Sequence, residues 1–218
     1  MIRDLKATFE IKKYNEIFYG IIVFGAVLLS LIITVCTEDD LTIIELCASF
    51  IAGGYIGMSI FFKPFLVATD FPRALSFGMT RKKMFIYTRL YDLVEIIIIS
   101  LIIIALPSVV GASVVLKVAA LCFGVFSLIS GAVGNSIIRF GKNAYWVYYV
   151  GIFVLMFGIP RLSHIFPVIR DCFASAFDHL VNPVYNQLGI WFGIIVFIVV
   201  TLIISWLTTR KVAVNNDL

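Results

Sequence analysis

The residues that could do chemistry are few in this chain, and their spacing does not suit catalysis. The two histidines, His164 and His179, have neither an HExxH pattern nor a paired carboxylate at metal-ligand spacing. No GxSxG or comparable nucleophile motif occurs. Gly141-Lys142 is only superficially like a phosphate-binding loop, because Ser136 replaces the leading glycine and Asn143 replaces the serine or threonine. We therefore expect no catalytic residue, no metal site and no cofactor in this chain.

The four cysteines have no CxxC or metal-like spacing, so we interpret them as packing residues: Cys36, Cys47, Cys122 and Cys172. A disulfide between Cys36 and Cys172 is left open, because both are expected near the same face of the membrane. Residue type and side alone say little about disulfide geometry.

Three charged residues lie inside apolar stretches, and each lies within about two turns of a stretch end. They are Glu45, Glu95 and Lys117, which could pair or extend to the membrane interface. A carrier driven by protons or sodium usually needs carboxylates near the middle of the membrane. The sequence places none there, which favours energy supplied from outside the chain.

The composition indicates a membrane protein. Of the 218 residues, 61% are hydrophobic and only 14% are charged. A water-soluble domain of this size would have to expose large apolar patches. No small-residue cleavage site follows the first apolar stretch, so we expect that stretch to be a retained helix rather than a signal peptide.

Six stretches are long and apolar enough to cross a hydrocarbon layer of about 30 Å as helices. They cover residues 17–36, 43–62, 93–110, 112–138, 144–159 and 189–207. The runs are uniform rather than alternating, which excludes strands of a membrane barrel. We predict an all-α, polytopic fold with a single transmembrane domain over 17–207.

The positions of lysine and arginine predict the orientation. With the N-terminus inside, all 17 basic residues except Lys117, Arg161 and Arg170 fall in inner segments. Both termini, including the tail 208–218, are then expected in the cytoplasm. The net charge of +4 follows from this bias and from attraction to anionic inner-leaflet lipid, so it needs no nucleic-acid partner.

Three segments outside the six stretches have patterns of their own. Residues 1–16 are expected to form an amphipathic helix on the cytoplasmic surface, with a frayed tail as the alternative. Residues 160–188 are expected to form an outer interfacial or re-entrant helix, with a structured loop as the alternative.

The third segment, 63–92, is the main cytoplasmic loop. Asp70 and Pro72 predict the start of a short helix that extends to Phe77 and ends at Gly78. Thr80 is then expected to cap a second helix that continues into the third span. Two short helices that project from the membrane could dock on another protein.

This arrangement resembles the type-2 ABC transporter permeases, in the small bacterial group. The topology agrees over nearly the whole chain. Two local motifs add to the resemblance: ALSFGMTRKKMF at 74–85 is similar to the stretch after the coupling helix, and GNSIIRFGKNAYW at 134–146 is similar to the turn between the fourth and fifth spans.

The resemblance implies a permease subunit without catalytic activity, paired with an identical or related permease in the bacterial plasma membrane. A separate ATPase subunit would bind ATP and Mg²⁺ and would dock on the loop. The residues implied in ATPase coupling are Asp70, Phe71, Arg73, Phe77, Met79, Thr80, Arg81 and Lys82. The passenger would be an exported amphipathic or antimicrobial or cytolytic peptide, or a lipid-like molecule.

Two other functions remain open on the sequence. The first is a stand-alone secondary carrier or substrate-binding membrane component, whose transport would persist without an ATPase. The second, an intramembrane enzyme, is disfavoured by the lack of a His, Asp and Glu cluster at membrane depth.

Overall fold

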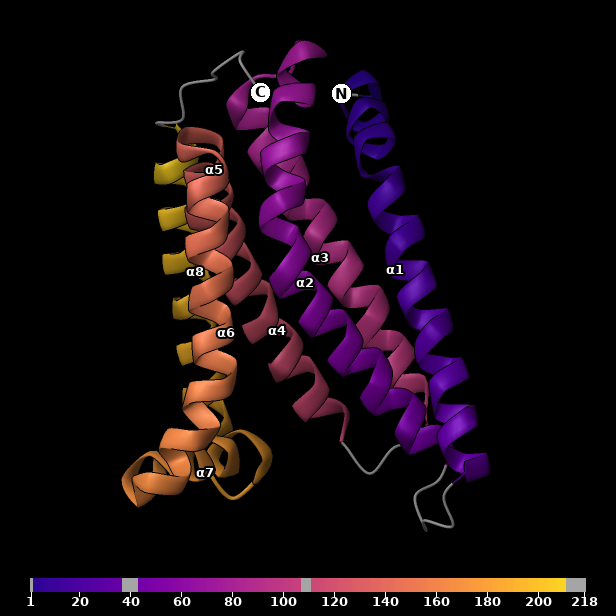
Figure 1. Cartoon of the computed structure of the whole chain (residues 1–218), viewed down its shortest axis with the longest axis vertical. Helices are drawn as coiled ribbons and strands as arrows, with labels where there is room; N and C mark the ends of the chain where they lie inside the picture. The colour runs from indigo at the N-terminus through magenta and orange to yellow at the C-terminus, as the bar shows by residue number, and fades with distance from the viewer. Residues whose placement is uncertain (1, 37–42, 107–110, 211–218) are drawn as a thin grey trace.

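The chain folds into a bundle of long helices that run side by side, with one helix lying across an end of the bundle (Figure 1). The computed structural model describes residues 2–36, 43–106 and 111–210. Every regular element in these ranges is helical, which confirms the all-α prediction. The elements are α1 (Ile2–Cys36), α2 (Ile43–Ser76), α3 (Arg81–Ala105), α4 (Ala112–Ile129), the π-helical turn η1 (Ser130–Gly134), α5 (Asn135–Phe140), α6 (Lys142–Ile165), α7 (Pro167–Val181) and α8 (Gln187–Arg210).

Within the described residues, five segments are long and apolar enough to cross a membrane. These segments are Glu16–Thr34, Ile43–Ser76, Ala112–Phe140, Lys142–Ile165 and Gln187–Arg210. α3 runs beside them in the bundle (Figure 1) but carries Arg89, Asp92 and Glu95 in its central part. The start of α1 and the end of α8 lie at the same end of the bundle, opposite α7 (Figure 1).

The N-terminal segment is not a separate surface helix, because α1 is continuous from Ile2 to Cys36. The predicted boundary at residue 16 therefore does not coincide with the end of a helix. In the described part of this segment, Thr8, Ile11 and Lys12 are buried against the bundle, whereas Phe9 is exposed. The contacts of α1 with α2 and α3 thus decide which face is covered. The predicted apolar face also included Ile2 and Leu5, whose side chains are outside the residues that the structure describes.

The predicted loop at 63–92 is instead a helical hairpin. α2 continues through Pro64 and Pro72 to Ser76, and α3 begins at Arg81, so no separate short helix starts at Asp70. The predicted turn after it is confirmed: Gly78 has a φ of 74°, and the Thr80 side chain accepts a hydrogen bond from the Lys83 N–H at 3.3 Å. We call residues 64–84 the hairpin arm.

The segment 160–188, predicted to form an outer interfacial or re-entrant helix or a structured loop, contains a helix together with the end of α6. α6 extends to Ile165 through Pro160, and α7 follows as a distinct helix across the end of the bundle (Figure 1). Lys117 in α4 is buried and donates hydrogen bonds to the Leu180 carbonyl, at 2.8 Å, and to the Gln187 side chain. This lysine therefore holds the end of α7 and the start of α8 against α4.

Small residues allow close helix packing at two glycines. A Cβ added at Gly131 would lie 2.6 Å from the Ser205 Cα of α8, and one at Gly134 would lie 2.9 Å from Val67 Cγ1 of α2. Both contacts leave room only for hydrogen. Gly53 and Gly57 are different, because a Cβ at either position would meet nothing within 4 Å.

A proline in α2 determines where α6 attaches. Pro64 lacks an N–H, so the carbonyl of Ile60 has no intrahelical donor. The Tyr148 hydroxyl of α6 donates to this carbonyl at 2.6 Å, and Tyr149 donates to the next carbonyl, Phe61, at 2.9 Å. These two hydrogen bonds join α6 to α2 at one level. The bond from Tyr148 satisfies the Ile60 carbonyl, to which no water could donate in lipid.

Candidate functional site

Five charged residues from three helices meet in the interior of the bundle. Lys12 lies in α1, Lys63 in α2, and Arg89, Asp92 and Glu95 lie in α3. All five are buried. We call this group the ion network. It lies between two apolar clusters, one around Tyr55 and Phe126 in the bundle and one around Phe71 and Met84 in the hairpin arm.

Asp92 is the centre of the ion network. Its Oδ1 lies 3.3 Å from the Lys63 Nζ and 3.6 Å from the Lys12 Nζ, and its Oδ2 accepts from Arg89 Nη1 at 3.1 Å. Arg89, Asp92 and Glu95 are spaced three residues apart, which places them on one face of α3. One helix face thus presents both signs of charge to Lys63.

Lys63 connects the two carboxylates. Its Nζ lies 3.0 Å from Glu95 Oε1. It also lies 5.2 Å from the ring centroid of Phe126 and 5.8 Å from those of Tyr19 and Tyr55. Three aromatic faces and two carboxylates therefore surround one ammonium group, which offsets its loss of hydration.

Glu16 completes the charge balance. It is partly buried in α1 and within electrostatic reach of Lys12, Lys63 and Glu95. Three acids, Glu16, Asp92 and Glu95, then balance three bases, Lys12, Lys63 and Arg89. A neutral group of this kind can lie inside an apolar bundle at much lower cost than any of its members alone.

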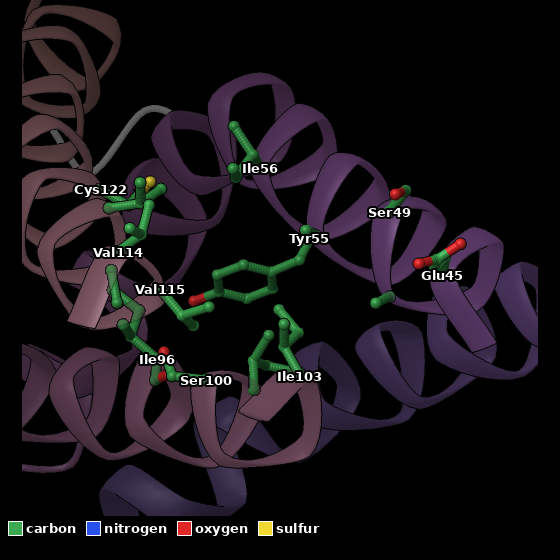
Figure 2. Close-up of a pocket in the computed structure, with 15 residues that line it drawn as sticks. Glu45, Ser49, Tyr55, Ile56, Ile96, Ser100, Ile103, Val114, Val115 and Cys122 are labelled. Atoms are coloured by element: carbon green, nitrogen blue, oxygen red, sulfur yellow. The ribbon is translucent and has the colours of Figure 1, made fainter. Parts of the chain in front are cut away.

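A cavity of about 500 Å³ lies next to the network, between α2, α3 and α4. Figure 2 shows the Tyr55 ring extending into this space, with Ile96, Ser100 and Ile103 to one side and Val114, Val115 and Cys122 to another. The Tyr55 hydroxyl donates to Glu95 Oε1 at 2.6 Å. Tyr55 is therefore both a wall of the cavity and a member of the polar contacts around the network.

The predicted coupling residues divide into buried and exposed groups. Phe71, only 1% exposed, is packed in the core of the hairpin arm with Met79, and Asp70 is also buried. The exposed members are Arg73, Phe77, Thr80, Arg81 and Lys82, and Phe77 is 58% exposed. At the tip of the arm, the exposed Phe77 ring therefore lies among cationic side chains. These are Arg73, Arg81 and Lys82.

The histidines and cysteines form no reactive group in the part of the chain that the structure describes. No cluster of three or more His, Cys, Asp or Glu residues suited to a metal occurs there. His179 stacks on Tyr185 at 3.9 Å between centroids, and Asp178 raises the pKa of the Tyr185 phenol by accepting its hydrogen bond. Cys172 is an exposed free thiol, whereas the side chain of Cys36, its suggested partner, lies outside the described residues.

Sequence reasoning missed the ion network for a simple reason. It assigned Lys63, Arg89 and Asp92 to a water-exposed loop and placed Glu95 at the start of a span. In the structure α3 begins at Arg81, so Glu95 lies well inside a helix rather than at its start. The signal available was the spacing of Arg89, Asp92 and Glu95 on one helix face.

Comparison of the chain with protein-family models, with curated proteins and with solved structures finds no match.

Proposed function

We propose that this chain is the permease subunit of an ABC exporter in a bacterial plasma membrane, driven by a separate ATP-binding subunit. The observation that carries the proposal is the hairpin arm. From Ile43 to Lys63, α2 spans roughly 30 Å, which equals the hydrocarbon thickness. The remainder of α2, to Ser76, adds roughly another 20 Å.

The arm is suited to hold a partner because its tip is both apolar and basic. Phe77 is exposed there beside Arg73, Arg81 and Lys82. An aromatic anchor with cations at its rim is a common composition for a protein interface. The buried pair Phe71 and Met79 would give the arm the stiffness to transmit motion of the partner to α2 and α3.

In this proposal α3 is the sixth span, with both termini in the cytoplasm. The charges on α3 do not exclude a membrane position, because Lys12 and Lys63 balance Asp92 and Glu95 across the helix contacts. The passenger would be an amphipathic or lipid-like molecule, and a second copy of the chain or a related permease would complete the transporter.

A Phe77→Asp variant tests the docking role of the arm. We expect it to lose copurification with the ATPase subunit and to lose stimulation of ATP hydrolysis by roughly tenfold or more, because a hot-spot aromatic contributes about 2 kcal/mol or more. The matched control is Phe173→Asp in α7, which is equally exposed at the opposite end. Unchanged association of the Phe77→Asp variant would refute docking at this tip.

The ion network also supports a second candidate, a secondary carrier, because carboxylates inside a membrane bundle often bind the coupling ion. In that case purified chain alone in liposomes would transport its passenger, and transport would stop when the ion gradient is collapsed. The exporter proposal instead predicts transport that needs the ATPase subunit and tolerates collapse of the gradient.

A further inference from the structure

The cavity between α2, α3 and α4 has room for a ligand. Its volume of about 500 Å³ falls within the range of about 300–1,000 Å³ that small-molecule sites occupy. It is lined by 15 residues, of which only Glu45, Ser49, Tyr55 and Ser100 carry an oxygen in the side chain. The walls therefore suit a hydrocarbon far better than a sugar, a nucleotide or an inorganic ion.

The few polar groups are not distributed evenly along the cavity. Ser100 donates its hydroxyl to the Ile96 carbonyl at 2.7 Å, and Tyr55 donates to Glu95, so neither offers a free proton to a ligand. The part of the cavity around Tyr55 and Ser100 thus presents hydrocarbon and hydroxyls that are already hydrogen-bonded. An apolar tail loses little by entering it.

The end of the cavity at the start of α2 is lined by a carboxylate. Glu45 lies in the first turn of α2 and lines the cavity there. A carboxylate has about four acceptor sites, so Glu45 can hold a cationic group in addition to contacts within the chain. A cavity with a carboxylate at one end and hydrocarbon along its walls is complementary to an amphiphile with a cationic head.

We infer that this cavity binds the hydrocarbon tail of a single-chain cationic amphiphile, whose positively charged head lies at Glu45. The inference rests on the proposed function in treating this ligand as a passenger, but binding itself requires no ATPase partner. Because Tyr55 joins the cavity wall to Glu95 and Lys63, an occupied cavity would contact the network that holds α1, α2 and α3 together.

Photolabelling of the full chain in phosphatidylcholine nanodiscs tests the inference. The probe is dodecylammonium with a diazirine near the tail end, and the labelled residues are mapped by peptide mass spectrometry. We expect labelling to concentrate on residues that line the cavity, such as Ile96, Val115 and Cys122. Labelling spread over the lipid-facing residues of α6 and α8 to the same degree would overturn the inference.

Two variants separate the tail site from the head site. Val118→Phe narrows the cavity, and exclusion of two methylene groups should weaken labelling roughly fifteenfold, since each buried methylene contributes about a factor of four. Its matched control is Val199→Phe on an exposed face of α8, which should label as the unmodified chain does. Ala52→Leu repeats the test if Val118→Phe fails to fold, as judged by size-exclusion chromatography.

The charge requirement has its own comparison. Glu45→Gln should reduce labelling by dodecylammonium about twofold to fivefold, as for a partly exposed ion pair, and should leave labelling by an uncharged dodecanol probe unchanged. Equal labelling by ammonium, alcohol and sulfate probes would overturn the cationic head. A negative result here, with the Phe77→Asp result as expected, would leave the exporter proposal intact and reject only this ligand.

Discussion

At the scale of single residues, Lys63 has the most demanding position. It is almost completely buried, and it contacts both Asp92 and Glu95. Lysine at the end of an apolar run usually extends to the membrane surface. Here α2 continues past Lys63 in spite of Pro64, and the ammonium group lies inside the bundle.

Lys63→Met should therefore lower the free energy of unfolding by about 3–5 kcal/mol, because it leaves two buried carboxylates with too few cations. The measurement is unfolding in mixed micelles, followed by circular dichroism. The control is Lys82→Met, at an exposed position of the hairpin tip, which should change the free energy of unfolding by less than about 0.5 kcal/mol. Similar losses in both variants would mean that the ion network contributes no more than a surface charge.

At the scale of helices, Pro64 of α2 determines where α6 attaches to α2. None of the residues of α6 is buried in the chain, and its aromatic contacts with α2 come from Tyr145, Tyr149 and Phe153. The hydroxyl of Tyr148 supplies the hydrogen bond that Pro64 cannot. The proline and the tyrosine should therefore be energetically coupled.

A double-mutant cycle measures this coupling. Tyr148→Phe alone should destabilise the fold by about 1 kcal/mol, because the Ile60 carbonyl loses its donor. In the background of Pro64→Ala, the new N–H of residue 64 can bond the same carbonyl, so Tyr148→Phe should cost clearly less. Equal costs in both backgrounds would show that the tyrosine does not substitute for the missing backbone donor.

At the scale of the whole molecule, the number of membrane crossings depends on α3. Five segments of the described chain meet the length and composition of a span, and α3 runs beside them in the bundle (Figure 1). The charges of α3 are paired inside the bundle. If α3 crosses, the turn before it and the start of α4 after it must lie on opposite sides.

Thiol labelling tests this arrangement. In a chain without its native cysteines, Ser76→Cys should react with a membrane-impermeant maleimide only after the cells are opened, and Ala112→Cys should react in intact cells. Both positions are exposed in the chain. Reaction of both from the same side would contradict the sixth span and, with it, the even number of crossings.

The sequence by itself determined the properties that depend on composition and local chemistry. A chain with 61% hydrophobic residues in long uniform runs has to form apolar helices. Local chemistry also predicted the turn at Gly78 and Thr80, because a left-handed glycine and a side-chain cap involve only neighbouring residues.

Only the tertiary structure decided which polar residues are buried. Lys12, Lys63 and Asp92 belong to three different helices, and each alone is typical of a water-exposed segment. The cost of burying each charge is offset by partners that are distant in the sequence, so no local pattern could reveal it. The same holds for the cavity, whose walls come from α2, α3 and α4 and exist only once these helices pack.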